Sequence, residues 1–159
     1  MPASDGLEQG LRELSVVASA LNEATDKLNE RIVSIEERLN SMGVGATYWL
    51  DQTEHHLSVG PWVEARVSGE DGRSRESWTV GYAKVGSKWC LAAQEVDTQE
   101  TCIDGESLKW KPRKSFRIGK PITLLSAPRI VRVEAVEKMG ALIAGLTETT
   151  KDFLSSIRG

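Results

Sequence analysis

Between residues 7 and 42, apolar residues recur at alternating intervals of four and three, and this heptad repeat constrains the fold more than any other feature of the chain. Such spacing places the side chains along one face of an α-helix. The d positions are Leu7, Leu14, Leu21, Leu28, Ile35 and Met42, and the a positions are Leu11, Ala18, Thr25, Ile32 and Leu39. We therefore predict one amphipathic helix over 5–42, with Asp5 as its N-cap and Gly43 in the left-handed conformation that ends a helix.

This predicted helix is longer than the rest of the chain can cover. At about 1.5 Å per residue it would measure about 55 Å, whereas a compact domain of this size has a radius of gyration of about 15 Å. Val17 and Ala24, at g, also widen the apolar face beyond a two-stranded seam. We expect a coiled-coil homo-oligomer in which both terminal helices join copies from another subunit, of open helix number and orientation; a monomer with an intramolecular helix pair is the alternative. The expected interface residues are Leu14, Leu21, Leu28, Ile32, Ile35 and Leu39.

A second helical pattern occupies the C-terminal segment, 127–158. Its apolar stripe continues by threes and fours through Ala135, Met139, Leu142 and Leu146. Further apolar residues beside this stripe widen it, so we expect this helix to contact more than one neighbour.

The stretch 78–95 predicts a β-hairpin. Gly86 and Ser87 suit a two-residue type II′ turn, which would place Val85 opposite Lys88 and continue in register to Trp78 opposite Glu95. One face would then carry large side chains: Trp78, Val80, Tyr82, Trp89, Leu91 and Ala93. The other face would carry small ones: Gly81, Ala83, Val85, Cys90 and Ala92. We expect the large face to form the main core, although an aromatic groove is an alternative, and the small face to lie under a helix.

The remaining β region is less regular. Residues 46–51 and 62–67 are strand candidates, 70–77 is predicted to be a polar loop, and Asp104-Gly105 predicts a second hairpin turn with Glu100 opposite Lys109. Together these patterns predict an α+β fold for a single domain, 1–159: a helix over 5–42, an antiparallel β region over 44–122 and a helix over 127–158.

No sequence pattern indicates catalysis, a cofactor or a metal. His55 and His56 are adjacent, so they would point apart in a strand, and two ligands are too few for a closed zinc site. Cys90 and Cys102 have no neighbouring histidine or paired cysteine that would activate a thiol. The sequence therefore predicts a protein that is not an enzyme.

Charge and hydropathy restrict the possible partners. The net charge is only −3, and no stretch approaches the roughly 18 apolar residues of a membrane span. The first residues lack the features of a signal peptide, and two cysteines make no disulfide framework. We expect a cytoplasmic protein with no membrane partner.

A basic and aromatic segment, 109–120, is the best candidate ligand site. It contains Lys109, Trp110, Lys111, Arg113, Lys114, Phe116, Arg117 and Lys120 and has no acidic residue. Such a composition suits nucleic acid or a phosphorylated ligand, although basic residues also protect the edges of sheets. The expected function is a non-enzymatic, helix-mediated oligomeric scaffold or partner-binding protein. A nucleic-acid or phosphorylated-ligand binding module is the alternative, and nucleic acid is not favoured.

Overall fold

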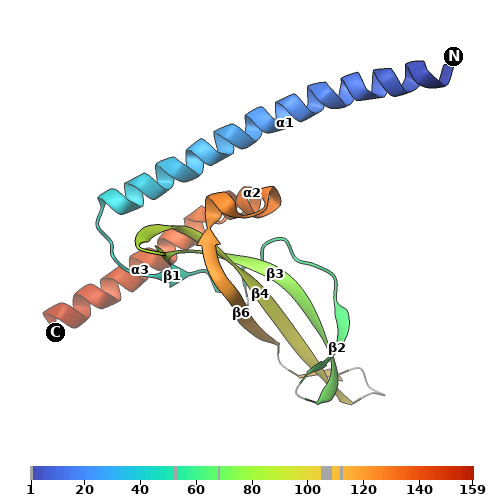
Figure 1. Ribbon diagram of the computed structural model, residues 1–159. Coiled ribbons are helices and arrows are strands. Elements are labelled where there is room, and N and C mark those ends of the chain that lie inside the picture. Colours follow the sequence, from blue (N-terminus) through green and yellow to red (C-terminus); the bar gives the residue numbers. More distant parts are fainter. Residues whose placement is uncertain (1, 52–53, 68, 105–108, 112) are drawn as a thin grey trace.

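The computed structural model describes residues 2–51, 54–67, 69–104, 109–111 and 113–159. It shows a long N-terminal helix, an antiparallel sheet and C-terminal helices, which confirms the predicted α+β fold (Figure 1). The elements are α1 Pro2–Ser41, β1 Tyr48–Trp49, β2 Val63–Val67, β3 Glu70–Val85, β4 Lys88–Asp104, β5 Lys109–Trp110, β6 Lys114–Thr123, the 3₁₀ turn η1 Leu124–Ser126, α2 Arg129–Glu137 and α3 Met139–Arg158. Within these described ranges, no helix is both long and apolar enough to cross a membrane.

The hairpin of β3 and β4 is the centre of the sheet. Its register is the predicted one, with Val85 opposite Lys88 and Trp78 opposite Glu95. Gly86 has a φ of 66°, as the first turn residue of a type II′ turn requires. The predicted polar loop over 70–77 is wrong, because these residues form the first half of β3 and pair with β4 as far as Gly72 opposite Thr101.

Further strands run along the outer edges of this hairpin. On the β3 edge, β1 pairs Tyr48 with Tyr82, and β2 pairs Val63 with Ser74. On the β4 edge, β6 pairs between Ala92 and Gln99. Both strands, β1 and β2, confirm the predicted strand candidates.

The predicted register of the second hairpin is wrong. The residue of β4 opposite Lys109 is Asp104, whereas Glu100 lies opposite Arg73 of β3. Gly105, the predicted turn glycine, lies outside the described residues. The connection to β5 is longer than a two-residue turn, so local turn chemistry could not fix its register.

The large face of the hairpin forms the main core, as predicted. Val80, Tyr82 and Leu91 are buried there, and the Tyr82 and Trp89 rings stack with their centroids 5.4 Å apart. All three helices cover this face, and they contribute Ile32, Leu39, Val131, Ala135, Met139, Leu142 and Leu146 to the same cluster. The aromatic face is therefore core rather than groove.

The small face is covered by a tryptophan, so the prediction that it lies under a helix is wrong. Ala83, Cys90 and Ala92 form a separate buried cluster with Trp49. A Cβ atom added to Gly81 would lie 2.6 Å from the Trp49 ring, and β1 pairs these two residues directly. The small side chains admit a flat indole, and the helices lie on the opposite face.

Polar side chains of α1 complete an edge of the sheet. β4 extends beyond the end of β6, which leaves backbone groups of Trp89 and Leu91 without a strand partner. The Leu91 N–H donates to Glu36 Oε2 at 2.9 Å, and Asn40 Nδ2 donates to the Trp89 carbonyl at 3.2 Å. Asn40 Oδ1 also accepts from the Tyr82 hydroxyl at 2.6 Å. These contacts fix the C-terminal part of α1 against the sheet.

The ends of the helices differ in part from prediction. Because α1 begins at Pro2, Asp5 lies in its first turn rather than at its N-cap. Gly43 has a φ of 64°, which confirms its predicted left-handed conformation. The single helix predicted over 127–158 is instead two helices, since the backbone breaks at Lys138. This break lets Val131 of α2 and Leu142 of α3 reach one core from different directions.

Candidate functional site

The N-terminal part of α1 extends away from the sheet and the other helices (Figure 1). Its apolar side chains are exposed: the exposed fractions are 63% for Leu14 and 47% for Leu21, against 0% for Ile32. The predicted overhang is therefore present. We name its apolar positions the open seam: Leu7, Leu11, Leu14, Val17 and Leu21.

The C-terminal part of the same heptad packs within the chain. Ile32 and Leu39, two of the predicted oligomer-interface residues, are buried in the chain's own core, so they offer no surface to a partner. Leu28 and Ile35 are partly buried against that core. Of the predicted interface, Leu14 and Leu21 remain exposed.

α2 marks the point where the intramolecular packing of α1 ends. Arg132 donates to Asn29 Oδ1 at 2.6 Å, and Arg129 donates to Asn22 Oδ1 at 3.4 Å. The predicted alternative, an intramolecular helix pair, thus applies to α1 from Asn22 onward.

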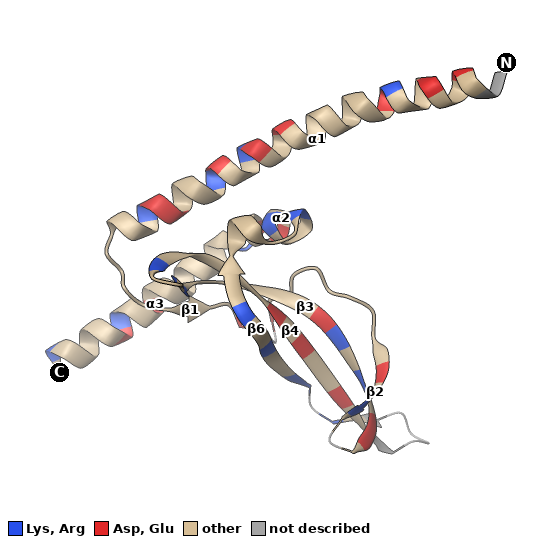
Figure 2. Ribbon diagram, in the orientation of Figure 1, with Lys and Arg blue, Asp and Glu red and all other residues tan. Residues whose placement is uncertain are grey.

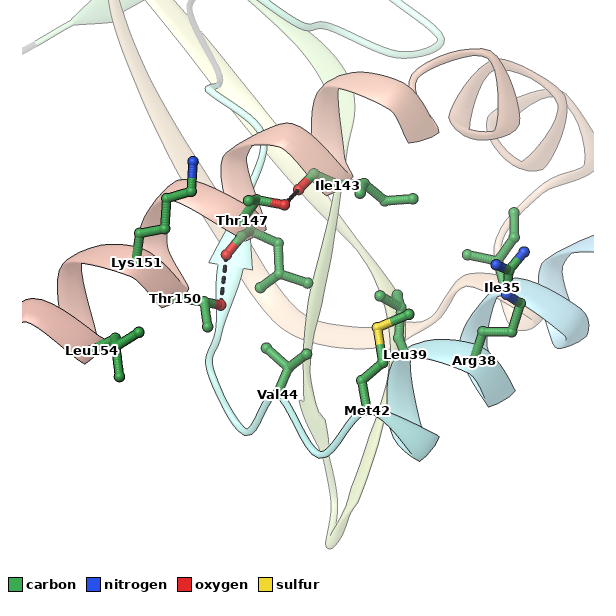
Figure 3. Close-up of a pocket in the computed structure, with 11 residues that line it drawn as sticks. Ile35, Arg38, Leu39, Met42, Val44, Ile143, Thr147, Thr150, Lys151 and Leu154 are labelled. Carbon is green, nitrogen blue, oxygen red and sulfur yellow. Dashed lines mark hydrogen bonds between the residues drawn. The ribbon is translucent and has the colours of Figure 1, made fainter.

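An apolar groove of about 420 Å³ lies between the C-terminal end of α1 and α3 (Figure 3). Its walls include Leu39 and Met42 from one side and Leu154 from the other. The Thr147 and Thr150 hydroxyls donate to carbonyl groups of their own helix at 2.7 Å. The groove thus has few polar groups that could orient a ligand.

Arginine and tryptophan side chains gather on the sheet face opposite the helices. Arg73 and Arg75 share this face because side chains two residues apart in a strand point the same way. Glu100 lies directly opposite Arg73, and Arg113 forms a salt bridge with Glu100. We name the group the arginine–tryptophan cluster: Trp62, Arg73, Arg75, Glu100, Trp110 and Arg113.

Within this cluster the guanidinium groups stack on indole rings. The Arg73 guanidinium carbon lies 4.3 Å from the Trp62 ring centroid and 4.2 Å from that of Trp110, so this side chain contacts both tryptophans. The guanidinium carbon of Arg75 is 4.5 Å from the Trp62 centroid, and that of Arg113 is 5.6 Å from it. Three cations therefore converge on one indole.

Glu100 is the carboxylate that holds this arrangement. Its side chain is 4% exposed; Arg73 Nε donates to one carboxylate oxygen at 2.6 Å, and Arg113 Nε donates to the other. Burial opposes ionisation of Glu100, but the hydrogen bonds from Arg113 and Arg73 outweigh it and hold the carboxyl pKa below its usual value. Glu100 is therefore ionised at neutral pH.

Arg75 forms no salt bridge with Glu100, although the negative charge of Glu100 favours its protonated form. No salt bridge joins it to another described residue, and its Nε atom is buried without a hydrogen-bond partner. Burial and then repulsion from Arg113 lower its pKa. Three arginines and one glutamate give the cluster a net charge of +2.

The predicted basic segment 109–120 does not form one continuous site. Figure 2 shows charges of both signs along the strands that surround it. Alternation along β6 places Arg117 on the face of the cluster, and Lys114 and Phe116 on the other face. Arg113 precedes β6 and reaches the cluster through its salt bridge with Glu100.

The other residues of this segment are also dispersed. Lys111 forms a salt bridge with Glu70 at 2.9 Å, and Lys120 lies where the register of β6 against β4 shifts. Lys109 and Trp110 form the short strand β5. Arg73 and Arg75 were missed from the sequence, because 70–77 was predicted as a loop; their i, i+2 spacing was the available signal.

The histidines and cysteines are the sequence candidates for metal or thiol chemistry. No group of three or more His, Cys, Asp or Glu side chains that could hold a metal occurs among the described residues. His56 Nδ1 lies 3.2 Å from the Ser77 hydroxyl. Burial, and then Glu36, raise the pKa of the Cys90 thiol, which disfavours the nucleophilic thiolate.

Comparisons with family models, with curated proteins and with solved structures found no match for this chain.

Proposed function

We propose that the protein is a non-enzymatic, self-associating scaffold or partner-binding protein, and that the open seam of α1 pairs with the same seam of a second copy. The observation that carries this proposal is the exposure of apolar side chains at successive heptad positions, from 63% at Leu7 to 47% at Leu21. A contiguous apolar surface of this kind is typical of an interaction site. The low cysteine content favours the cytoplasm as the location.

A second copy fits this surface because the heptad pattern is complementary to itself. The neighbouring e positions are Glu8, Ser15 and Asn22, so they carry one charge and create little repulsion between identical helices. A helical segment without tertiary contacts is also only marginally stable in water, and pairing would stabilise it by burying its apolar face. These features favour a second copy of this chain over a helix of another protein whose flanking positions carry complementary charges.

The proposal is tested by substituting the seam and measuring the mass by light scattering. Leu14→Glu combined with Leu21→Glu places charges in the seam without touching the core, so we expect a folded monomer of 17.5 kDa. Val16→Glu is the matched control, since Val16 is 70% exposed at the f position outside the seam, and its mass should equal that of the wild type. An unchanged mass for the double variant, or an equal loss of association in Val16→Glu, would contradict the proposal.

A further inference from the structure

We propose that the arginine–tryptophan cluster binds the phosphate group of a small phosphorylated ligand, with Arg75 and Arg113 as the principal ligands. This inference concerns the sheet face opposite the helices and is independent of self-association through α1. It replaces the continuous segment 109–120 with a site assembled from β3, β4 and the residues that flank them.

The charge distribution of the cluster favours an anion. Three guanidinium carbons lie between 4.3 and 5.6 Å from the Trp62 centroid, and Glu100 is the carboxylate that pairs with two of them. Arg75 forms no salt bridge with a described residue and has a buried Nε donor without an acceptor. A bound oxyanion would supply both the missing negative charge and the missing acceptor.

Hydroxyl groups lie beside these cations in the pattern of the sheet. Thr98 of β4 is opposite Arg75 on one side and Ser115 on the other, so the three residues form one row across the sheet. The Thr98 and Ser115 hydroxyl oxygens are 2.9 Å apart, and Arg113 precedes Ser115 by two residues on the same face. Thr98 is buried, so Ser115, which is half-buried, is the hydroxyl that could reach a phosphate beside the arginine forks.

The surroundings of the cluster favour a small ligand over nucleic acid. Arg73 already contacts the rings of both Trp62 and Trp110, so these indoles are engaged and less available for stacking bases. On the cluster's own face the register places Glu64 opposite Arg73 and Asp71 two residues from it, so the positive charge is confined to a short patch around Arg75 and Arg113. A nucleic-acid strand would require a longer basic track.

Calorimetric titration with inorganic pyrophosphate tests this site at constant ionic strength. We expect saturable binding at one site per chain. Arg75→Gln and Arg113→Gln should each weaken binding about 10-fold or more, because each removes a charge-assisted hydrogen bond. Arg66→Gln is the matched control: Arg66 is exposed and pairs with Asp71 rather than with the cluster, so its affinity should stay within about twofold of the wild type.

Thermal melts of each variant separate loss of binding from loss of fold. Arg113→Gln removes a hydrogen bond to Glu100, whereas Arg75→Gln removes its contact with the Trp62 ring but no hydrogen bond or salt bridge to a described residue, so Arg75→Gln is the decisive variant. The monomeric variant Leu14→Glu/Leu21→Glu should bind pyrophosphate as the wild type does, which distinguishes failure of this site from failure of the α1 proposal.

Three results would overturn the inference. The wild type could fail to bind pyrophosphate, or Arg66→Gln could weaken binding as much as Arg75→Gln does, which would indicate a diffuse charge effect. A 12-nucleotide oligo(dT) that binds more tightly than pyrophosphate and is lost in Arg75→Gln would assign the site to nucleic acid instead.

Discussion

Replacing Glu100 by Gln would neutralise the buried carboxylate that holds Arg73 and Arg113 together. The substitution keeps the size of the side chain, so it tests charge and hydrogen bonding rather than packing. Both carboxylate oxygens accept hydrogen bonds from guanidinium groups. In glutamine, an NH₂ group replaces one of these oxygens, so one arginine would face a donor instead of an acceptor. We therefore expect the folded state to lose stability.

The size of the stability loss depends on the burial of Glu100 and on the exposure of Arg73 and Arg113. Breaking a buried ion pair from one side typically costs about 3–5 kcal/mol. The Arg73 and Arg113 side chains are 29% and 54% exposed, so water can partly replace the lost carboxylate. We accordingly expect the lower end of this range, about 3 kcal/mol of unfolding free energy.

The pH dependence provides a second test of the same ion pair. Burial disfavours the charged form of Glu100, but its two arginine partners favour that form more strongly, and the pKa in the folded state is lowered. A lowered folded-state pKa contributes stability that is fully present above about pH 5, where an unfolded glutamate with a pKa of about 4.3 is ionised. This contribution is lost as the pH falls through the folded-state pKa, so the difference between wild type and Glu100→Gln should shrink in acid.

Urea denaturation at one protein concentration, at pH 7 and at decreasing pH, measures these differences. Glu70→Gln is the matched control, because Glu70 and Lys111 form an exposed salt bridge with side chains 53% and 47% exposed. It should cost less than about 1 kcal/mol. If Glu100→Gln costs no more than Glu70→Gln, or if its effect does not change with pH, the reasoning is refuted.

Two packing predictions can be checked in the same denaturation assay. Gly145→Ala should destabilise by about 1–3 kcal/mol, because the new Cβ would lie 2.1 Å from Tyr48 Cζ, whereas Gly140→Ala has open space and should not destabilise. Trp89→Ala should cost about 3 kcal/mol by removing the ring stacked on Tyr82, and an unchanged melting temperature would mean that this face is not core.

The features that could be predicted from the sequence are those with a strong local or periodic signal. The turn at Gly86-Ser87 and the period-two alternation together determined the hairpin register, and the structure has that register. The heptad predicted a helix too long for its own domain, and α1 does extend beyond the fold. Both signals depend on neighbouring residues only.

The wrong predictions depended on pairings between distant segments. Trp49 covers Gly81 because β1 aligns with β3, and no local pattern specifies that alignment. Residues 70–77 resemble a loop in composition. A half-buried strand usually alternates apolar and polar residues, but here arginines occupy the positions where apolar residues would be expected. That misassignment also concealed the arginine–tryptophan cluster, in which Arg73 and Glu100 are 27 residues apart.

The most direct test of the account is the mass of the wild-type protein in solution, measured by sedimentation equilibrium over a range of concentrations. Pairing through the open seam predicts a mass of at least twice the 17.5 kDa of one chain, with dissociation toward the monomer on dilution. A mass of 17.5 kDa at every concentration would contradict self-association through α1.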